Sequence, residues 1–170
     1  YQPTLICEKP GGRPRVLENF LVDKKIIIQD IATEINATID DEKYLCNDTL
    51  NIIYDVSEDY LMEYILTLLN SKFVNNWFKK MYPAGLHIKT NQLEQIPIPS
   101  LSLSEQDMYV VLANRMLSLH RQLQTKRNRF LRRLSDNFVG IKVTTVLSSF
   151  DQLTFAEFLK ELKKQKIKLS

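Results

Sequence analysis

The first half of the chain alternates short apolar runs with polar turns, a pattern typical of β-strands. Residues 25–29 are apolar enough for a buried strand, and residues 34–39 alternate with period two like a half-exposed strand. Two further strands are predicted at residues 44–46 and 49–54. The pattern therefore predicts an antiparallel meander across residues 24–55.

From residue 57 the apolar period becomes helical. Ser57 is expected to cap a helix with Glu58 and Asp59 in its first turn. The apolar stripe of this helix is Leu61, Ile65, Leu68 and Leu69. Residues 70–71 interrupt the pattern before a second helix, which residues 82–85 end. The apolar face expected for the second helix is Phe73, Trp77 and Met81.

A proline-bearing connector precedes the longest predicted helix. Proline lacks a backbone donor and favours extended geometry in the residue before it, so residues 96–99 predict a stiff, extended spacer. Ser102 and Glu105 then form a capping box that opens a helix of about thirty residues. Its apolar seam is Leu112, Met116, Leu119, Leu123 and Phe130, with Lys126 at one inward position. Because one seam is not buried alone, a partner helix is expected from elsewhere in a longer protein or from another chain.

Beyond Gly140, which is expected to end the long helix, residues 141–146 are compatible with a strand or with irregular structure. A second capping box at residues 154–157 opens a short basic helix. The predicted fold class is therefore α+β: a small mixed or antiparallel sheet with two packed helices, then a long helical spacer and a short C-terminal helix. The chain lacks an initial Met and stops just after a helix, from which we expect a piece of a longer polypeptide.

Charge is distributed unevenly although the net charge is only +3. Between residues 108 and 135 there is no Asp or Glu, and the cations there are Arg115, Arg121, Lys126, Arg127, Arg129, Arg132 and Arg133. A second basic run holds five lysines between residues 160 and 168. Such faces suit a polyanion.

Catalytic and metal-binding motifs are absent from the sequence. His87 and His120 have no Cys or carboxylate at ligand spacing, and no phosphate-cradling glycine loop or nucleophile elbow occurs. Cys7 and Cys46 are expected to be reduced core residues. No apolar run would span a bilayer and no signal peptide opens the chain, so a cytoplasmic location and no membrane partner are expected. This piece is therefore expected to bind rather than catalyse, without a cofactor or metal of its own.

The order of the elements resembles a known family. The strand at 24–31, the phrase 60–72 with its Leu-Asn-Ser ending, the Ile-Pro-Ile-Pro phrase at 92–99 and the Ser-Glu-Gln helix start at 104–106 are similar to the target recognition domain of restriction-modification proteins. Both type I specificity subunits and the C-terminal specificity domain of Taq-type adenine methyltransferases and type IIG enzymes show these elements. Residues 150–158 resemble the end of single-chain type IIG enzymes more closely.

The resemblance implies three segments with different functions along the chain. It implies a DNA target recognition domain at residues 1–99, a helical spacer at 100–138 and a C-terminal helical extension at 139–170. The parent would be an adenine-specific DNA methyltransferase, with or without endonuclease activity, that uses S-adenosylmethionine, with Mg²⁺ as a further candidate. A rigid spacer would fix the distance between the bases being read and the base that is flipped out for methylation. The partners implied are double-stranded DNA and the methyltransferase or nuclease domain of the same parent chain.

DNA contacts are expected from side chains that suit phosphates or base edges. The first group is Lys72, Asn75, Asn76, Lys79, Lys80, His87, Lys89, Thr90, Asn91 and Gln92. The second group is Arg13, Arg15, Lys24 and Lys25. A solvated face is the alternative for each member. For Arg127, Arg129, Arg132 and Arg133, phosphate binding competes with pairing to acids on a partner helix.

A second interpretation belongs to another functional class. The unpaired seam would suit an assembly module, a type I-like specificity subunit that docks catalytic subunits or forms a helix-mediated dimer. A recognition domain should prefer one duplex sequence and lose affinity steeply in salt, whereas a scaffold should associate without regard to DNA.

Overall fold

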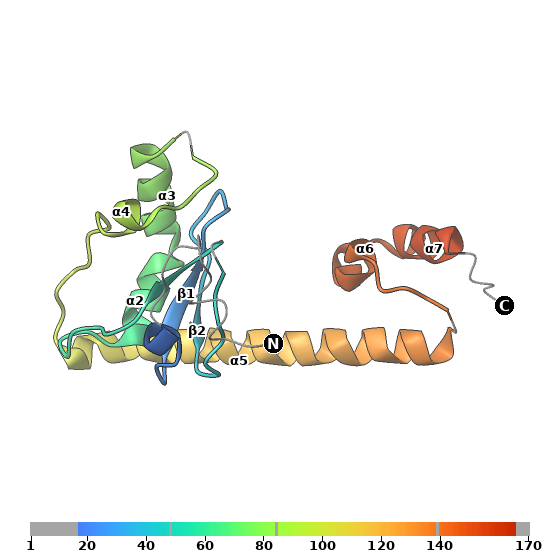
Figure 1. The fold of residues 1–170 in the computed structure, drawn as a ribbon, viewed down its shortest axis with the longest axis horizontal. Coiled ribbons are helices and arrows are strands. Elements are labelled where there is room, and N and C mark those ends of the chain that lie inside the picture. The colour runs from blue at the N-terminus through green and yellow to red at the C-terminus, as the bar shows by residue number, and fades with distance from the viewer. Residues whose placement is uncertain (1–16, 48, 84, 139, 166–170) are drawn as a thin grey trace. The chain divides into compact units, whose positions relative to one another are not determined.

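The computed structural model describes residues 17–47, 49–83, 85–138 and 140–165. The chain divides into two compact units between Arg115 and Met116. The first contains a short 3-10 helix (η1, Leu17–Phe20), a three-stranded antiparallel sheet and the helices that follow it, and the second contains short helices beside the end of the longest helix (Figure 1). The α+β class predicted from the sequence is confirmed.

The sheet is built around its most apolar strand. Strand β1 (Lys25–Gln29) lies in the centre, with β2 (Ala37–Asp40) and β3 (Leu50–Ile53) antiparallel on either side. Ile27 stands opposite Thr38 on one side and Ile52 on the other. The prediction of an antiparallel sheet is confirmed, but the predicted strand order, a meander, is wrong. Strand β3 pairs with β1 and not with β2, because the fully buried Ile26 and Ile28 make β1 the central strand.

The expected strand at residues 44–46 is replaced by a loop that folds around Asp40. One carboxylate oxygen of Asp40 accepts the backbone N–H of Glu42 and the other that of Tyr44, both at 2.9 Å. Lys43 adopts φ of 60°, so the chain turns sharply within this loop. These local bonds take up backbone donors that a strand would have used for pairing.

The Asp40 carboxylate is also the partner of a buried lysine. Lys25 is fully buried, forms an ion pair with Asp40 and donates a hydrogen bond to the carbonyl oxygen of Phe20 at 2.7 Å. Burial tends to raise the pKa of Asp40, but the Lys25 ammonium and the two backbone N–H groups outweigh it, so the pKa lies below its usual value. Lys25 therefore stabilises the interior of the fold. The expectation that it contacts DNA is wrong, because its side chain is buried.

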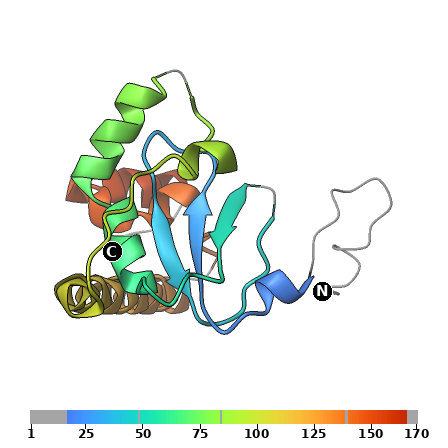
Figure 2. The same cartoon turned by 90° about the vertical axis from the view of Figure 1, so that its left-hand side faces the viewer.

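Helix α2 (Met62–Leu69) covers one face of the sheet with the buried side chains Tyr64, Leu66 and Leu69 (Figure 2). It begins at Met62 and not directly after Ser57, whose hydroxyl instead accepts the N–H of Asp59 in a turn at 3.4 Å. The expected interruption at residues 70–71 is present. Ser71 caps helix α3 (Lys72–Met81) by accepting the N–H of Val74 at 3.1 Å.

Helix α3 is rotated relative to the expectation. Its buried residues are Val74, Asn75 and Phe78, whereas Phe73 is 76% exposed and Met81 is 55% exposed. The amide of Asn75 fixes this orientation, because it accepts the N–H of Ile35 at 2.6 Å and donates to the carbonyl of Leu69 at 3.2 Å. The expected apolar face is therefore wrong at Phe73 and Met81, whereas Trp77 is half-buried.

Helix α4 (Thr90–Leu93) and an extended proline connector lead to α5 (Leu103–Asn137). The glutamate half of the predicted capping box is confirmed, since Glu105 accepts the N–H of Ser102 at 2.8 Å, and the Ser102 hydroxyl donates to the same carboxylate at 2.6 Å. Tyr64 donates its hydroxyl to the carbonyl of Pro99 at 2.9 Å, and its ring meets the ring of Tyr109 edge-on. The connector and the first turns of α5 are thereby attached to α2 within the first unit.

The second unit is a small helical cluster. Helix α6 (Thr145–Ser148), the 3-10 helix η2 (Phe150–Gln152) and α7 (Phe155–Lys164) follow Gly140, whose φ is +86°. Its core is Leu134, Leu147 and Leu162. The second capping box is confirmed by Thr154 and Glu157. No helix in the described ranges has both the length and the apolarity to cross a membrane.

Candidate nucleic-acid interface

The loop between β1 and β2 gathers the segments that the sequence singled out for DNA contact. Residues 86–88 run antiparallel to its first part: Ile88 donates its N–H to the Asp30 carbonyl at 2.7 Å, and Ala32 donates to Leu86 at 3.0 Å. The later part of the loop contacts α3 through Ile35 and Glu34. The two parts of the first predicted group, residues 72–80 and 87–92, therefore flank one loop.

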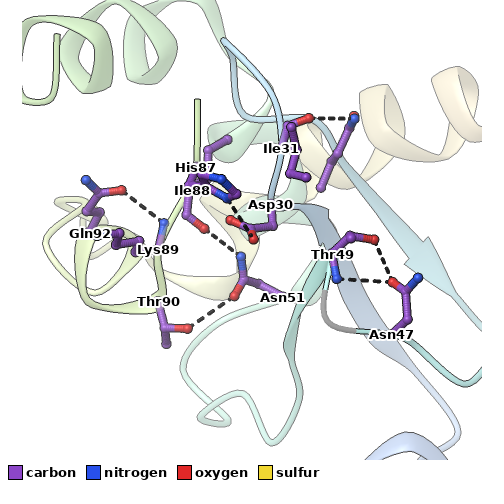
Figure 3. A network of polar contacts seen from close by, with 11 residues as sticks. Asp30, Ile31, Asn47, Thr49, Asn51, His87, Ile88, Lys89, Thr90 and Gln92 are labelled. Carbon is purple, nitrogen blue, oxygen red and sulfur yellow. Dashed lines mark hydrogen bonds and ion pairs between the residues drawn. The ribbon is translucent and has the colours of Figure 1, made fainter. Parts of the chain in front are cut away.

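A set of polar side chains lies beside this loop, and Figure 3 shows its members other than Asn91 from close by. We call it the polar edge: Asn51, His87, Lys89, Thr90, Asn91 and Gln92. Asn51 of β3 donates to the carbonyl of Ile88 at 2.7 Å and accepts the hydroxyl of Thr90 at 3.1 Å. Gln92 accepts the backbone N–H of Lys89 at 3.0 Å. The start of α4 is thus positioned by one amide from a neighbouring strand.

Several donors of the polar edge remain directed to solvent. Lys89 and Asn91 are exposed, and the amide nitrogen of Gln92 is left over once its oxygen has accepted from Lys89, whereas the hydroxyl of Thr90 is engaged with Asn51. His87 is exposed and lies 3.3 Å from the carboxylate of Asp30. Amide and imidazole groups of this kind can hydrogen-bond base edges, and an ammonium can contact a phosphate.

The solvent face of α3 supplies further cations. Lys72, Asn76 and Lys80 are exposed, and within the described ranges neither lysine meets a carboxylate. Lys79 forms an ion pair with Glu34 of the loop, and this hydrogen bond and charge lower the pKa of the Glu34 carboxyl. Lys72 and Lys80 are therefore better placed for a phosphate than Lys79, whose charge is already balanced.

Other expected contacts are placed differently by the structure. Asn75 is buried and serves the packing of α3, so the expectation that it faces DNA is corrected. Lys24 is half-buried and forms an ion pair with Glu63 of α2. Arg13 and Arg15 lie outside the described residues. The second predicted group consequently contributes no side chain to the polar edge within the described ranges.

Sequence reasoning missed the residues that organise this region. Asn51 was assigned to a strand without a role, and Asp30 was not considered as a partner of His87. A usable signal was present for Asn51, because it is the one polar residue in the strand sequence Leu-Asn-Ile-Ile. A lone amide within an apolar strand needs a partner, and that partner is the segment carrying His87 and Thr90.

The basic residues of α5 are divided between pairing and exposure. Arg127 forms an ion pair with Asp151, and this contact lowers the pKa of the Asp151 carboxyl. Arg129, Arg132 and Arg133 are exposed. In the part of the chain that the structure describes, no group of three or more His, Cys, Asp or Glu side chains could hold a metal ion.

Two known protein families match this chain, each over a different range of residues. Residues 6–98 match the family described as TaqI-like C-terminal specificity domain, which confirms the resemblance to the Taq-type recognition domain. Residues 102–170 match a domain of unknown function, DUF8810. Neither a curated protein nor a solved structure matches the chain.

Proposed function

Because the chain belongs to the TaqI-like C-terminal specificity domain family, we propose that it recognises a DNA sequence within a restriction-modification protein. The observation that carries the proposal is the polar edge. There, Asn51 fixes the start of α4, where Lys89 and Asn91 are exposed and Gln92 is half-buried, beside the exposed His87. A fixed array of amide donors and acceptors is what reading base edges in a groove requires.

We assign two roles to the exposed side chains. Lys72, Lys80 and Lys89 contact phosphates and set the register of the duplex, because their charges are not balanced by a carboxylate in the described ranges. His87, Asn91 and Gln92 read base edges: the amide of Asn91, the amide nitrogen of Gln92 and the ring nitrogen of His87 that does not face Asp30 are suited to hydrogen-bonding bases in the major groove. Thr90 supports this reading through its bond to Asn51.

For the whole protein we propose an adenine-specific DNA methyltransferase, with or without endonuclease activity, of the type IIG kind. Such a parent would act in the cytoplasm. Its catalytic domain would supply the S-adenosylmethionine site and any Mg²⁺ site, and this recognition domain would contact that catalytic domain. The recognition unit is suited to this because its last helix is attached to α2 by Tyr64, Pro99 and Tyr109. A fixed attachment keeps the read bases at a constant distance from a flipped base.

Selection from a random duplex library tests the proposal directly. The chain should enrich one sequence, and its affinity should fall steeply as salt rises. Asn91→Ala should relax the enriched sequence at one or two positions, whereas Lys89→Ala should weaken all duplexes alike and reduce the salt slope by about one. Lys142→Ala, which changes an exposed lysine outside both basic runs, is the matched control. Failure to enrich any sequence would overturn the proposal.

An assembly module is the second candidate, favoured by the exposure of the α5 seam. Met116 is 54% exposed and Leu119 is 49% exposed, which is unusual for apolar side chains in register along a helix. In a type I-like arrangement this seam would dock catalytic subunits. Association in sedimentation experiments without any preference for a DNA sequence would favour this candidate over recognition.

A further inference from the structure

The polar edge includes a histidine whose ring is oriented by a carboxylate. Nδ1 of His87 lies 3.3 Å from a side-chain oxygen of Asp30 (Figure 3). The side chain of His87 is 58% exposed, whereas that of Asp30 is only 22% exposed. One nitrogen of the imidazole therefore faces a protein group, and the other is left for a ligand.

Main-chain pairing holds these two residues next to each other. His87 pairs with Ile31 in an antiparallel bridge, and Ile88 donates its N–H to the carbonyl of Asp30 at 2.7 Å. The amide of Gln29 also donates to the carbonyl of Ile31 at 2.8 Å. The position of His87 relative to Asp30 is consequently set by the backbone, which is what a contact that confers specificity requires.

The carboxylate determines which ring nitrogen of His87 carries the proton. An ionised carboxylate can only accept a hydrogen bond, so Nδ1 of the neutral ring must donate to Asp30. Nε2 then has a lone pair and no proton. In the major groove of DNA, the groups that donate to such a nitrogen are the exocyclic amino groups of adenine and cytosine.

An apolar side chain beside His87 discriminates between these two bases. Ile31 stands opposite His87 in the bridge and is 49% exposed. Directly opposite side chains of an antiparallel pair lie on the same face, so Ile31 and His87 are presented together. The A·T pair offers both an amino donor, at adenine N6, and an apolar group, the C5-methyl of thymine. A C·G pair offers the amino group without the methyl group.

We propose that His87 and Ile31 together read one A·T base pair in the major groove. Nε2 of His87 accepts from the adenine amino group, Ile31 contacts the thymine methyl group, and Asp30 positions the imidazole and fixes its proton on Nδ1. This inference rests on the proposed function and adds to it the base pair, the direction of the hydrogen bond and two residues outside the polar edge. The pair stays stacked in the duplex, unlike a base that is flipped out for methylation.

The position of the proton is measured on the full chain without DNA. Nitrogen-15 NMR of histidine-labelled protein shows which ring nitrogen is protonated, and His120→Gln identifies the signals of His87, because the chain has two histidines. At about pH 8, where histidine is ordinarily neutral, the proton should lie on Nδ1. Asp30→Asn replaces an obligate acceptor with an amide that also donates, so a population with the proton on Nε2 should appear. A proton on Nε2 in the unmodified chain would overturn the proposal.

Base analogues test the two contacts separately. In the sequence that the unmodified chain enriches, the position that His87→Ala relaxes should be A·T. Replacing that adenine with purine, which lacks the amino group, should weaken binding by about tenfold. Replacing the thymine with uracil, which lacks the methyl group, should weaken it by about fourfold. The first loss should vanish in His87→Ala and the second in Ile31→Ala, and losses that persist in these variants would contradict the assignment.

Two comparisons complete the experiment. Leu86→Ala is the matched control for Ile31→Ala, because Leu86 is 66% exposed but, as the residue before His87 in an extended segment, points to the opposite face. It should leave both losses unchanged. Asp30→Asn should reduce the ratio of affinities for the adenine and purine duplexes, a ratio in which the general effect of the lost charge cancels. A G·C pair at the relaxed position, or no relaxed position, would overturn this inference and leave DNA recognition intact, whereas failure to enrich any sequence would overturn both.

Discussion

The side-chain oxygen of Gln106 accepts the backbone N–H of Leu61 at 2.7 Å and so joins α5 to the start of α2. Gln106 is fully buried, and its amide nitrogen donates to the carbonyls of Asp59 at 2.7 Å and Leu101 at 2.9 Å. One side chain therefore satisfies three backbone groups from two segments. This explains why α2 begins at Met62, because the Leu61 N–H is held by a side chain and not by an upstream turn.

Gln106→Leu should destabilise the first unit by about 1–3 kcal/mol, because it leaves three backbone groups without their partner in a buried site. Urea unfolding measures the loss, and amide hydrogen exchange at Leu61 should become faster. Gln124→Leu is the matched control, since Gln124 is exposed and makes one bond within its own helix, to Asn128 at 3.0 Å. Equal stability of the two variants would show that the joint does not depend on Gln106.

The buried ion pair of Lys25 and Asp40 makes the free energy of unfolding depend on pH in the acid range. The folded pKa of Asp40 lies below its ordinary value of 3.8. Its contribution is therefore complete above pH 3.8 and is lost as the pH falls through the lower folded pKa. Asp40→Asn should cost about 3–5 kcal/mol at neutral pH, because it leaves the Lys25 ammonium buried without a counter-charge.

The difference in urea midpoint between the unmodified chain and Asp40→Asn should shrink as the pH is lowered below 3.8. Asp23→Asn removes an exposed partner from the ion pair with Lys43 and should leave the urea midpoint nearly unchanged at every pH, because solvent screens that pair. A loss for Asp40→Asn that stays constant down to the acid transition would contradict the role of its ionised form.

The orientation of α3 leads to opposite expectations for two phenylalanines on one helix. Phe78→Ala should cost about 3–5 kcal/mol because Phe78 is buried. Phe73→Ala should change stability by no more than about 0.5 kcal/mol, because the side chain is 76% exposed. Thermal unfolding distinguishes the two. A large loss for Phe73→Ala would instead support the face that sequence periodicity predicted.

Features fixed by neighbouring residues could be predicted from the sequence, and features fixed by distant ones could not. The capping box at Thr154 is local and was predicted correctly, as was the bond from the Ser102 N–H to Glu105. The face of α3 depends on the bond from Asn75 to Ile35, which lies on the β1–β2 loop. Helical spacing alone could not reveal it, because two apolar faces of α3 were available.

The same distinction applies to the candidate site. The stretch at residues 87–92 could be selected from its polar composition, but not the strand residue that orders it. In the sequence nothing distinguishes Lys25 from an exposed lysine at the start of a strand. Its burial depends on the ion pair with Asp40, which is distant in the sequence. The order of the strands likewise depended on which strand is most apolar on both faces, which residue spacing along one strand does not reveal.

Asn51→Leu should separate sequence reading from general attraction to DNA. The change keeps the size of the side chain but removes the donor to Ile88 and the acceptor of Thr90, so the start of α4 loses its attachment to β3. Affinity for the enriched duplex should fall roughly tenfold, while affinity for a random duplex should stay the same, because the lysines that contact phosphates are untouched. Fluorescence anisotropy at fixed salt measures both. Asn114→Leu makes the same chemical change at an exposed position of α5 and should alter neither. If Asn51→Leu weakened both duplexes equally, the polar edge would be a phosphate contact and the reading of bases would have to lie elsewhere.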